Sequence, residues 1–348
     1  MNIEKLVRQN ILKLKPYTSA RSTNNKGILL DANENPFGSV VENDVRELNR
    51  YPDPNQTKLR EKLSELIGIN QNNLFFGVGS DEIIDLLIKI FCKPNIDNVI
   101  ICEPTYGMYN VCCNINDIEI RTALLTNEFD IDVNAIMQLK DVNTKLLFLC
   151  SPNNPTGNLL NYSKIEELAK YTDIIIIIDE AYIDFADKKN SVELIKKYNN
   201  VILLRTFSKA WGLAGVRCGY CIADKIIIEL LFKIKAPYSI NKLTENIILN
   251  ALLNVANYNK LVSLIKKERE FLIKEMSNIN QIKKIYKTEA NFILFKVNNP
   301  KEVYKKLAER DIIIRDRSSQ INLEGCLRIS VGTREQNQLF IKNLKEVL

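Results

Sequence analysis

The chain has 348 residues, 46% of them apolar, which is sufficient for a large domain and a smaller unit. Its net charge is +6, but no basic block alternates with aromatic residues, so nucleic-acid binding is not indicated. Histidine is absent, which excludes Ser-His-Asp and Cys-His catalysis, HExxH zinc sites and any imidazole proton shuttle.

The N-terminus and the cysteines indicate a cytoplasmic protein. No signal peptide precedes Asn2, and the apolar run at 174–178 is far too short to cross a bilayer. Cys218 and Cys221 have CxxC spacing but lack a second ligand pair, so we interpret them as ordinary buried thiols. We therefore expect a cytoplasmic protein with reduced thiols and no membrane partner.

From about Thr57 onward, short apolar runs alternate with amphipathic stretches such as 80–91 and 163–170. Several runs are nearly continuous Ile, Leu or Val, as expected where helices cover both faces of a sheet. The alternation predicts an α/β fold with a mostly parallel, doubly wound sheet of seven strands. The predicted strands are 74–78, 99–102, 119–124, 145–150, 174–178, 201–204 and 217–222.

After Pro237 the pattern changes to that of a smaller α+β unit. Long helices are predicted at 241–255 and 258–277, followed by strands at 291–297, 312–315 and 327–331 with a helix at 301–309. We expect a large domain over 31–255 and a small domain over 256–348. The N-terminal arm, residues 1–30, is expected to pack with the small domain.

The first motif in chain order is "GVGSDE", residues 77–82, which closes one predicted strand and opens a helix. In open α/β sheets ligands bind outside the carboxyl ends of the strands. The glycines allow close backbone approach, and the free N–H groups of Ser80 and Asp81 suit an anion. The alternative is an ordinary N-cap by Ser80 or Asp81. The motif lacks the third glycine of a dinucleotide fingerprint.

Two further motifs follow strand ends. "SPNNPTG", residues 151–157, would by itself indicate only a turn. "IIIIIDEAY" places Asp179 and Glu180 directly after a buried strand. A carboxylate in that position needs a partner, although a helix cap is the plainer alternative for Asp179.

The segment "RTFSKAWGLAGVRCGY", residues 205–220, places Lys209 just after another buried strand. A lysine there, on a short loop, can form a Schiff base with an aldehyde cofactor. Arg217 adds a planar fork suited to phosphate, and Ser208 adds a hydroxyl. Each signal is weak alone, but the order GSDE, EPTYGMY, NPTG, DxxY, SK and Arg217 is specific.

With these motifs the chain resembles, over nearly its whole length, the fold-type I pyridoxal 5′-phosphate aminotransferases. Within them it is similar to the class II histidinol-phosphate aminotransferase family. The resemblance rests on "YTSAR", "DANENPFG", "RYPDP", "VGSDEIID", "EPTYGMY", "SPNNPTG", "IDEAYIDF", "TFSKAWGLAGVRCGY" and "GCLRISVGTREQN". It implies that pyridoxal 5′-phosphate is bound as a Schiff base on Lys209. That lysine would then move the proton of the substrate.

The resemblance also implies roles around the cofactor ring. Asp179 would pair with the pyridinium nitrogen and keep it protonated. Asn154 and Tyr182 would donate to the phenolate oxygen, and Tyr106 would stack on the ring.

The cofactor phosphate would be held by Gly79, Ser80, Asp81, Ser208 and Arg217. Tyr51 would reach the same phosphate from a neighbouring subunit, which implies a homodimer.

The implied reaction converts histidinol phosphate and 2-oxoglutarate into imidazole acetol phosphate and glutamate, in histidine biosynthesis. Arg328 resembles the family's carboxylate-binding arginine, and Arg315 falls at a second substrate-binding arginine. Tyr17 and Asn33 fall where the family places substrate contacts. Arg317 has no such match, and we interpret it as a solvated surface charge.

Three alternatives remain open at this point. An aromatic amino-acid aminotransferase or a phosphothreonine decarboxylase would use the same cofactor residues with a different substrate pocket. A non-catalytic, cofactor-binding regulatory protein is a third possibility. The intact set of Lys209, Asp179 and Arg217 argues against it.

Overall fold

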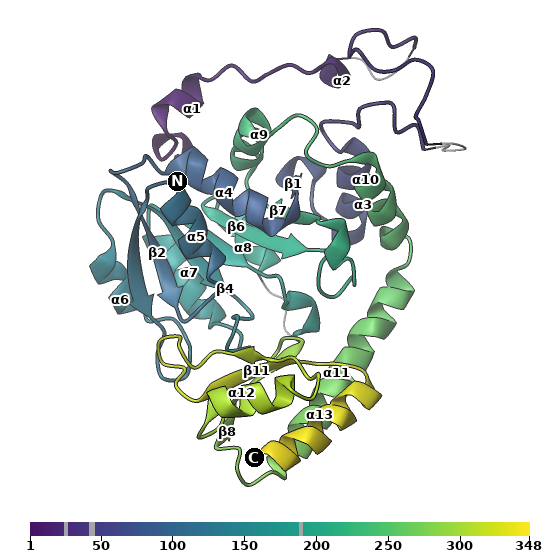
Figure 1. The fold of residues 1–348 in the computed structure, drawn as a ribbon. Coiled ribbons are helices and arrows are strands. Elements are labelled where there is room, and N and C mark those ends of the chain that lie inside the picture. The colour runs from purple at the N-terminus through teal and green to yellow at the C-terminus, as the bar shows by residue number, and fades with distance from the viewer. Residues whose placement is uncertain (24–26, 42–45, 188–190) are drawn as a thin grey trace.

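The computed structural model describes residues 1–23, 27–41, 46–187 and 191–348, and its centre is a seven-stranded sheet (Figure 1). The strands lie in the order β1-β7-β6-β5-β4-β2-β3, and only β7 runs antiparallel to its neighbours. The predicted mostly parallel sheet is therefore confirmed. The strands are β1 (Leu74–Gly77), β2 (Asn98–Glu103), β3 (Glu119–Leu124), β4 (Thr144–Cys150), β5 (Ile175–Asp179), β6 (Val201–Thr206) and β7 (Gly219–Ile222).

Helices cover both faces of this sheet because its strands are apolar on both sides. In β5, Ile176 and Ile178 pack into one core while Ile175 and Ile177 pack into the other, all fully buried. One face carries α4 (Gly79–Phe91), α5 (Met108–Ile115) and α9 (Lys225–Ile234). The other carries α3 (Thr57–Ile67), α6 (Val133–Leu139), α7 (Tyr162–Tyr171), α8 (Val192–Lys197) and α10 (Lys242–Leu252). Short 3-10 turns are η1 (Ile3–Lys5), η2 (Gln71–Asn73), η3 (Ile183–Phe185) and η4 (Ala214–Val216).

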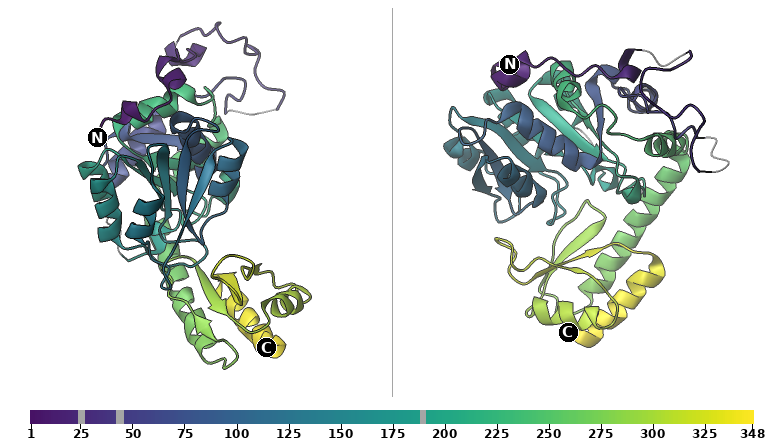
Figure 2. Two further views of the ribbon diagram at one scale, coloured as in Figure 1. Left: turned by 90° about the vertical axis from the view of Figure 1, so that its left-hand side faces the viewer. Right: turned by 45° about the horizontal axis from the view of Figure 1, so that its top comes forward.

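The C-terminal part forms a separate antiparallel sheet with its own apolar core. Its strands lie in the order β10-β11-β9-β8, and the long helix α11 (Val255–Ser277) runs from the large sheet down beside it (Figures 1 and 2). The other elements are β8 (Lys284–Ile285), β9 (Phe292–Lys296), α12 (Pro300–Ala308), β10 (Arg315–Asp316), β11 (Cys326–Ser330) and α13 (Arg334–Val347). The domain boundary predicted at 255–256 falls at the start of α11 and stays a prediction.

The first residues of the chain pack on the large sheet's helices, not on the small sheet. Ile3 and Val7 are buried in the core that contains α4 and α9. The short helix α1 (Gln9–Lys13) is held there because the backbone N–H of Arg8 donates to the Ile90 carbonyl. This differs from the expectation that the arm packs with the small domain. After α2 (Ala20–Thr23), part of the described segment 27–41 loops away from the body (Figure 1).

No helix within the described ranges is both long and apolar enough to span a bilayer.

Strand β7 crosses the start of α4 at very short range, which requires glycine at position 219. A Cβ on Gly219 would lie 2.5 Å from the backbone nitrogen of Ser80 and 2.7 Å from the carbonyl carbon of Gly79. Both are backbone atoms of the helix's first turn, so they cannot move aside as a side chain can. The strand therefore fixes the position of that turn.

We predict that Gly219→Ala lowers the free energy of unfolding by about 1–3 kcal/mol, the usual range for overpacking. Gly215→Ala is the matched control, because a Cβ at Gly215 meets no heavy atom within 4 Å. Urea unfolding followed by circular dichroism measures both. If Gly219→Ala and Gly215→Ala were equally stable, β7 and the first turn of α4 could move apart to accept a Cβ, and position 219 would not require glycine.

Candidate active site

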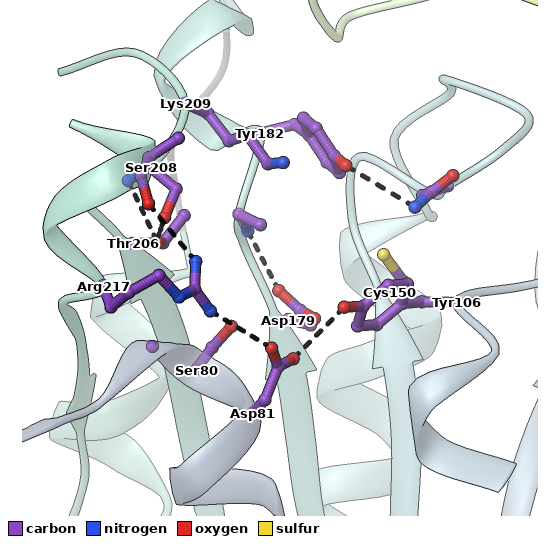
Figure 3. A pocket seen from close by; sticks show the side chains of 14 residues that line it. Ser80, Asp81, Tyr106, Cys150, Asp179, Tyr182, Thr206, Ser208, Lys209 and Arg217 are labelled. Atoms are coloured by element: carbon purple, nitrogen blue, oxygen red, sulfur yellow. Dashed lines mark hydrogen bonds and ion pairs between the residues drawn. The ribbon is translucent and has the colours of Figure 1, made fainter. Parts of the chain in front are cut away.

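A cavity of about 130 Å³ lies at the carboxyl ends of β4, β5 and β6, beside the start of α4 (Figure 3). The parallel register brings these strand ends together, since Cys150 pairs with Asp179 and Asp179 pairs with Leu204. Every residue predicted to contact the cofactor lines the cavity except Tyr51. The lining residues are Gly79, Ser80, Asp81, Tyr106, Cys150, Asn154, Asp179, Ala181, Tyr182, Thr206, Ser208, Lys209, Ala214 and Arg217.

The start of α4 offers an anion site. Its N-cap is Val78, which makes no side-chain cap bond, so the predicted alternative of a cap by Ser80 or Asp81 is wrong. Gly79 has a left-handed φ of 76°, and a Cβ there would lie 2.8 Å from Nη2 of Arg217. The first-turn N–H groups, the positive helix end and a guanidinium therefore meet in one place.

Two hydrogen bonds between Thr206 and Ser208 orient the side of the anion site opposite α4. The Ser208 N–H donates to Oγ1 of Thr206 at 3.0 Å, and the Thr206 hydroxyl donates to Oγ of Ser208 at 2.9 Å. Arg217 adopts a left-handed backbone (φ 56°), and its Nη2 lies 3.5 Å from Oδ2 of Asp81. Figure 3 shows Asp81 between Arg217 and Tyr106, whose hydroxyl donates to Oδ1 of Asp81 at 3.2 Å.

Asp179 ends β5 inside the protein and is only 3% exposed. Its Oδ2 accepts a 2.7 Å hydrogen bond from the Tyr109 hydroxyl, and its Oδ1 accepts the Ala181 N–H at 3.0 Å. Burial raises the pKa of Asp179 to about 6, although both hydrogen bonds act to lower it. The neighbouring Glu180 has a partner of its own, Nε of Arg205 at 2.8 Å. Asp179 is thus the buried carboxylate that faces the cavity.

Tyr109 was not predicted as a site residue. It is fully buried, and its ring stacks on Phe148 with the centroids 5.0 Å apart. The available signal was the second tyrosine of "EPTYGMY", which lies one helical turn after Tyr106.

Lys209 reaches into the cavity from the loop after β6, and its Nζ lies 5.6 Å from the centre of the Tyr182 ring. The side chain is exposed to the open side of the cavity. The protein atoms crowded around it, and then the positive charge of Arg328, hold the pKa of Lys209 below its usual value. The Tyr182 hydroxyl accepts a 3.5 Å hydrogen bond from Asn154, and burial raises the pKa of Tyr182. An amine and a hydroxyl therefore face the same space.

Arg328 of β11 links the small sheet to this cavity. Its guanidinium donates to Oδ1 of Asn154 and lies 4.8 Å from the centre of the Phe292 ring. Burial, and then the charge of Arg317, lower the pKa of Arg328 to about 10. Arg315 is exposed, and it pairs directly opposite Arg328 between β10 and β11. The interpretation of Arg317 as a solvated surface charge is wrong, because Arg317 is half-buried and close enough to Arg328 to perturb it.

Arg315, Arg328 and three further predicted site residues are not among the residues that line the cavity. Tyr17 is 78% exposed, and Asn33 lines a separate pocket together with Tyr51 and Asn241. Tyr51 is 48% exposed and stacks on Tyr238 with a centroid distance of 4.4 Å. Within this one chain, these three side chains stay apart from Lys209.

Comparison with known proteins agrees with this geometry. The family model described as "Aminotransferase class I and II" matches residues 20–344. The chain belongs to the class I and II aminotransferase family. It is 46% identical to the histidinol-phosphate aminotransferase of Cytophaga hutchinsonii over 346 residues, which cover 99% of each chain. It is also 46% identical to the one from Christiangramia forsetii, covering 99% of this chain and 98% of the relative.

Among solved structures, it is similar to the histidinol-phosphate aminotransferase from Clostridium acetobutylicum, with a TM-score of 0.80 and 28% identity. The match covers 87% of this chain and 92% of that one. The predicted fold type, the aminotransferase activity and the dependence on pyridoxal 5′-phosphate are confirmed as properties of the family. So is the resemblance to the histidinol-phosphate aminotransferases.

The hydrogen bond from Tyr109 to Asp179 leads to a prediction about how the stability of the protein depends on pH. Because the pKa of Asp179 is raised to about 6 in the folded protein, ionising this carboxyl costs stability as the pH rises through 6. The Tyr109 hydroxyl stabilises the ionised form, so Tyr109→Phe should raise the pKa further. A hydrogen bond to a charged group contributes about 1 kcal/mol more than one to a neutral group. We therefore expect the variant's loss of unfolding free energy to be about 1 kcal/mol larger at pH 8 than at pH 5.

Chemical denaturation of the cofactor-free protein at the two pH values measures this difference. Tyr106→Phe is the control, because Tyr106 also loses a hydroxyl in the same cavity but bonds Asp81, not Asp179. A pH-independent loss for Tyr109→Phe would mean that its hydroxyl does not act on the charge of Asp179.

Proposed function

We propose that this protein transfers the amino group of histidinol phosphate to 2-oxoglutarate, forming imidazole acetol phosphate and glutamate in histidine biosynthesis. The observation that carries the proposal is the convergence of Lys209, Asp179 and the α4 anion site on one cavity. The substrate follows from the histidinol-phosphate aminotransferases to which the chain is 46% identical over nearly its full length.

The cavity fits pyridoxal 5′-phosphate group by group. The first turn of α4 with Arg217 suits the phosphate, because the N-cap residue Val78 makes no side-chain cap bond to that turn. The buried carboxylate of Asp179 suits a protonated ring nitrogen. Burial raises the pKa of this carboxyl, and a neighbouring cation would stabilise its ionised form. Tyr182 and Asn154 can donate to the phenolic oxygen, and Tyr106 lies where it can cover a ring. We propose these roles for the five residues, together with Gly79, Ser80, Asp81 and Ser208 around the phosphate.

When bound, the cofactor withdraws electrons from the substrate's Cα. Lys209 would hold the cofactor covalently, a role for which its lowered pKa is suited because the neutral amine is the nucleophile, and it would then serve as the base at Cα. Asp179 would hold the proton on the ring nitrogen. Asn154 contacts the Tyr182 hydroxyl at 3.5 Å, so the two side chains face the same part of the cavity.

The arginines of the small sheet supply the substrate contacts. We propose that Arg328 binds the carboxylate of glutamate and that Arg328 and Arg315 bind the phosphate of histidinol phosphate. A guanidinium gives two parallel hydrogen bonds to either anion. Asn154 fixes the position of Arg328, so the substrate is placed relative to the cofactor. Tyr17 and Asn33 are proposed to complete this pocket.

The competing substrates are not favoured. An aromatic amino-acid aminotransferase or a phosphothreonine decarboxylase would share the cavity, but the relatives at 46% identity carry the name histidinol-phosphate aminotransferase. A purely regulatory protein would have no need of an amine with a lowered pKa beside a buried carboxylate.

The test is to incubate the purified protein and the cofactor with histidinol phosphate and 2-oxoglutarate and to measure glutamate. Lys209→Ala should bind the cofactor without covalent attachment and form no glutamate. Borohydride reduction followed by peptide mapping should label Lys209 in the unchanged protein. Turnover of phenylalanine or phosphothreonine but not of histidinol phosphate would refute the proposed substrate, and labelling of another lysine would refute the proposed catalytic residue.

We further propose that the protein is a homodimer in which Tyr51 of one subunit reaches the cofactor phosphate of the other. Two observations support this. Tyr51 does not line the cavity of its own chain. The segment before it, which loops away from the body, exposes large apolar side chains, with Ile28 91%, Phe37 97% and Val40 96% exposed. A second copy would cover this surface.

Mixing two inactive variants tests the shared site. Lys209→Ala and Tyr51→Ala homodimers should each be inactive or nearly so. A heterodimer should contain one intact site, with Lys209 from one chain and Tyr51 from the other. Because half of the randomly mixed dimers are heterodimers with one good site each, about a quarter of normal activity should return.

The control mixture is Lys209→Ala with Asp179→Asn, two changes that lie in the same cavity. This mixture should recover nothing, because every site carries one defect. No recovery in the first mixture, despite verified subunit exchange, would refute the shared site.

We propose the cytoplasm as the place of action. All eight cysteines are free and buried in the structure, which fits a reducing compartment.

A further inference from the structure

Arg317 lies on the same face of the small sheet as the two arginines already proposed to bind substrate. Arg315 pairs with Arg328 across the antiparallel strands β10 and β11. The pairing continues one step, because the Arg317 N–H donates to the Cys326 carbonyl at 3.0 Å. Side chains alternate along a strand, so positions 315 and 317 share the face that carries position 328. Three guanidinium groups therefore gather on one surface.

These guanidinium groups have little to neutralise them. Nε of Arg317 and Nε of Arg328 are both buried without a hydrogen-bond partner. Among the residues that the structure describes, neither Arg315 nor Arg317 forms an ion pair with a carboxylate. The adjacent carboxylate, Asp316, accepts the N–H of Ser318 at 2.8 Å.

The charges act on one another. Burial, followed by the charge of Arg315, lowers the pKa of Arg317. For Arg328, Arg317 lowers the pKa more than Arg315 does. Like charges that are partly desolvated and uncompensated repel each other, and an anion placed among them relieves that repulsion.

We propose that Arg317 is a third anion-binding arginine, which contacts the terminal phosphate of the substrate together with Arg315 and Arg328. A phosphate monoester carries close to two negative charges near pH 7, whereas a carboxylate carries one. Three guanidinium groups thus favour a phosphorylated substrate over an amino acid without phosphate. The inference rests on the proposed function, because that function supplies the phosphorylated substrate.

The experiment compares Arg317→Gln, Arg317→Lys and the unchanged protein, each loaded with cofactor so that the α4 anion site is filled. Arg310→Gln is the matched control for the loss of one positive charge, because Arg310 lies on the same small domain, exposed and paired with Glu346. Arg317→Gln should raise KM for histidinol phosphate at least tenfold with little change in kcat. KM for glutamate should change by less than about threefold. Arg317→Lys should give an intermediate loss, because it keeps the charge without the planar fork.

A second measurement does not depend on turnover. Calorimetric binding of inorganic phosphate to the cofactor-loaded protein should weaken at least tenfold in Arg317→Gln and stay unchanged in Arg310→Gln. The unchanged protein could bind phosphate through Arg317 without using histidinol phosphate as a substrate. That result would refute the proposed function but support Arg317 as an anion-binding residue. Equal losses for histidinol phosphate and glutamate, or phosphate binding that does not depend on Arg317, would overturn the inference. If Arg317→Gln does not fold, Arg317→Lys decides by the same two measurements.

Discussion

The burial of one carboxylate, Asp179, is the constraint on which the site depends. Asp179 ends a strand whose other residues are all isoleucine, and it is 3% exposed. Two hydrogen bonds, from Tyr109 and from the Ala181 N–H, do not offset the desolvation, so its pKa is raised to about 6. A buried carboxylate of this kind is stable when a cation faces it. This is why we propose that Asp179 faces the protonated ring nitrogen of the cofactor.

The positive groups are arranged at two ends of the space above this carboxylate. At one end, the start of α4 and Arg217 form an anion site that is held in place by the close approach of Gly219. At the other end, Arg328 reaches in from the small sheet and is fixed by Asn154. The proposed sites for the cofactor phosphate and the substrate anion are therefore separate. Lys209 lies between positive charges at both ends, and each of them lowers its pKa.

Much of this arrangement could be predicted from the sequence, because the strong signals are local. Short strand-like runs, several of them nearly continuous Ile, Leu or Val, marked all seven strands of the large sheet, and the motifs that follow them supplied most of the cavity residues. The two-residue strands of the small sheet were harder to predict. The predicted strand at 312–315 overlaps β10 only at Arg315, and β8, at Lys284–Ile285, was missed. Two-residue strands are defined by their partners, and sequence periodicity does not reveal partners.

The errors in the site have the same origin. The sequence predicts a surface charge at Arg317 because the position of Arg317 relative to Arg328 depends on the register of two strands, which a single sequence does not give. Tyr109 was missed because its hydroxyl acts on a residue seventy positions later in the chain. The N-terminal arm was expected on the small domain, but Val7 finds its apolar neighbours on the face of the large sheet that α4 and α9 cover. The positions of Arg317, Tyr109 and the N-terminal arm are all determined by contacts between residues that are far apart in the sequence.

The charge of Arg328 connects substrate binding to the chemistry at Lys209. After burial, Arg328 is the strongest influence that lowers the pKa of Lys209. When an anion binds Arg328, the two charges compensate, and the repulsion that Lys209 feels becomes weaker. An anion at Arg328 would therefore act to raise the pKa of Lys209 and make the amine a stronger base. In the free protein the same lysine is kept closer to neutrality and thus remains nucleophilic toward an aldehyde. The proposed role of Arg328 would thus favour covalent attachment before substrate binds and proton removal afterwards, with Asn154 holding the arginine in place.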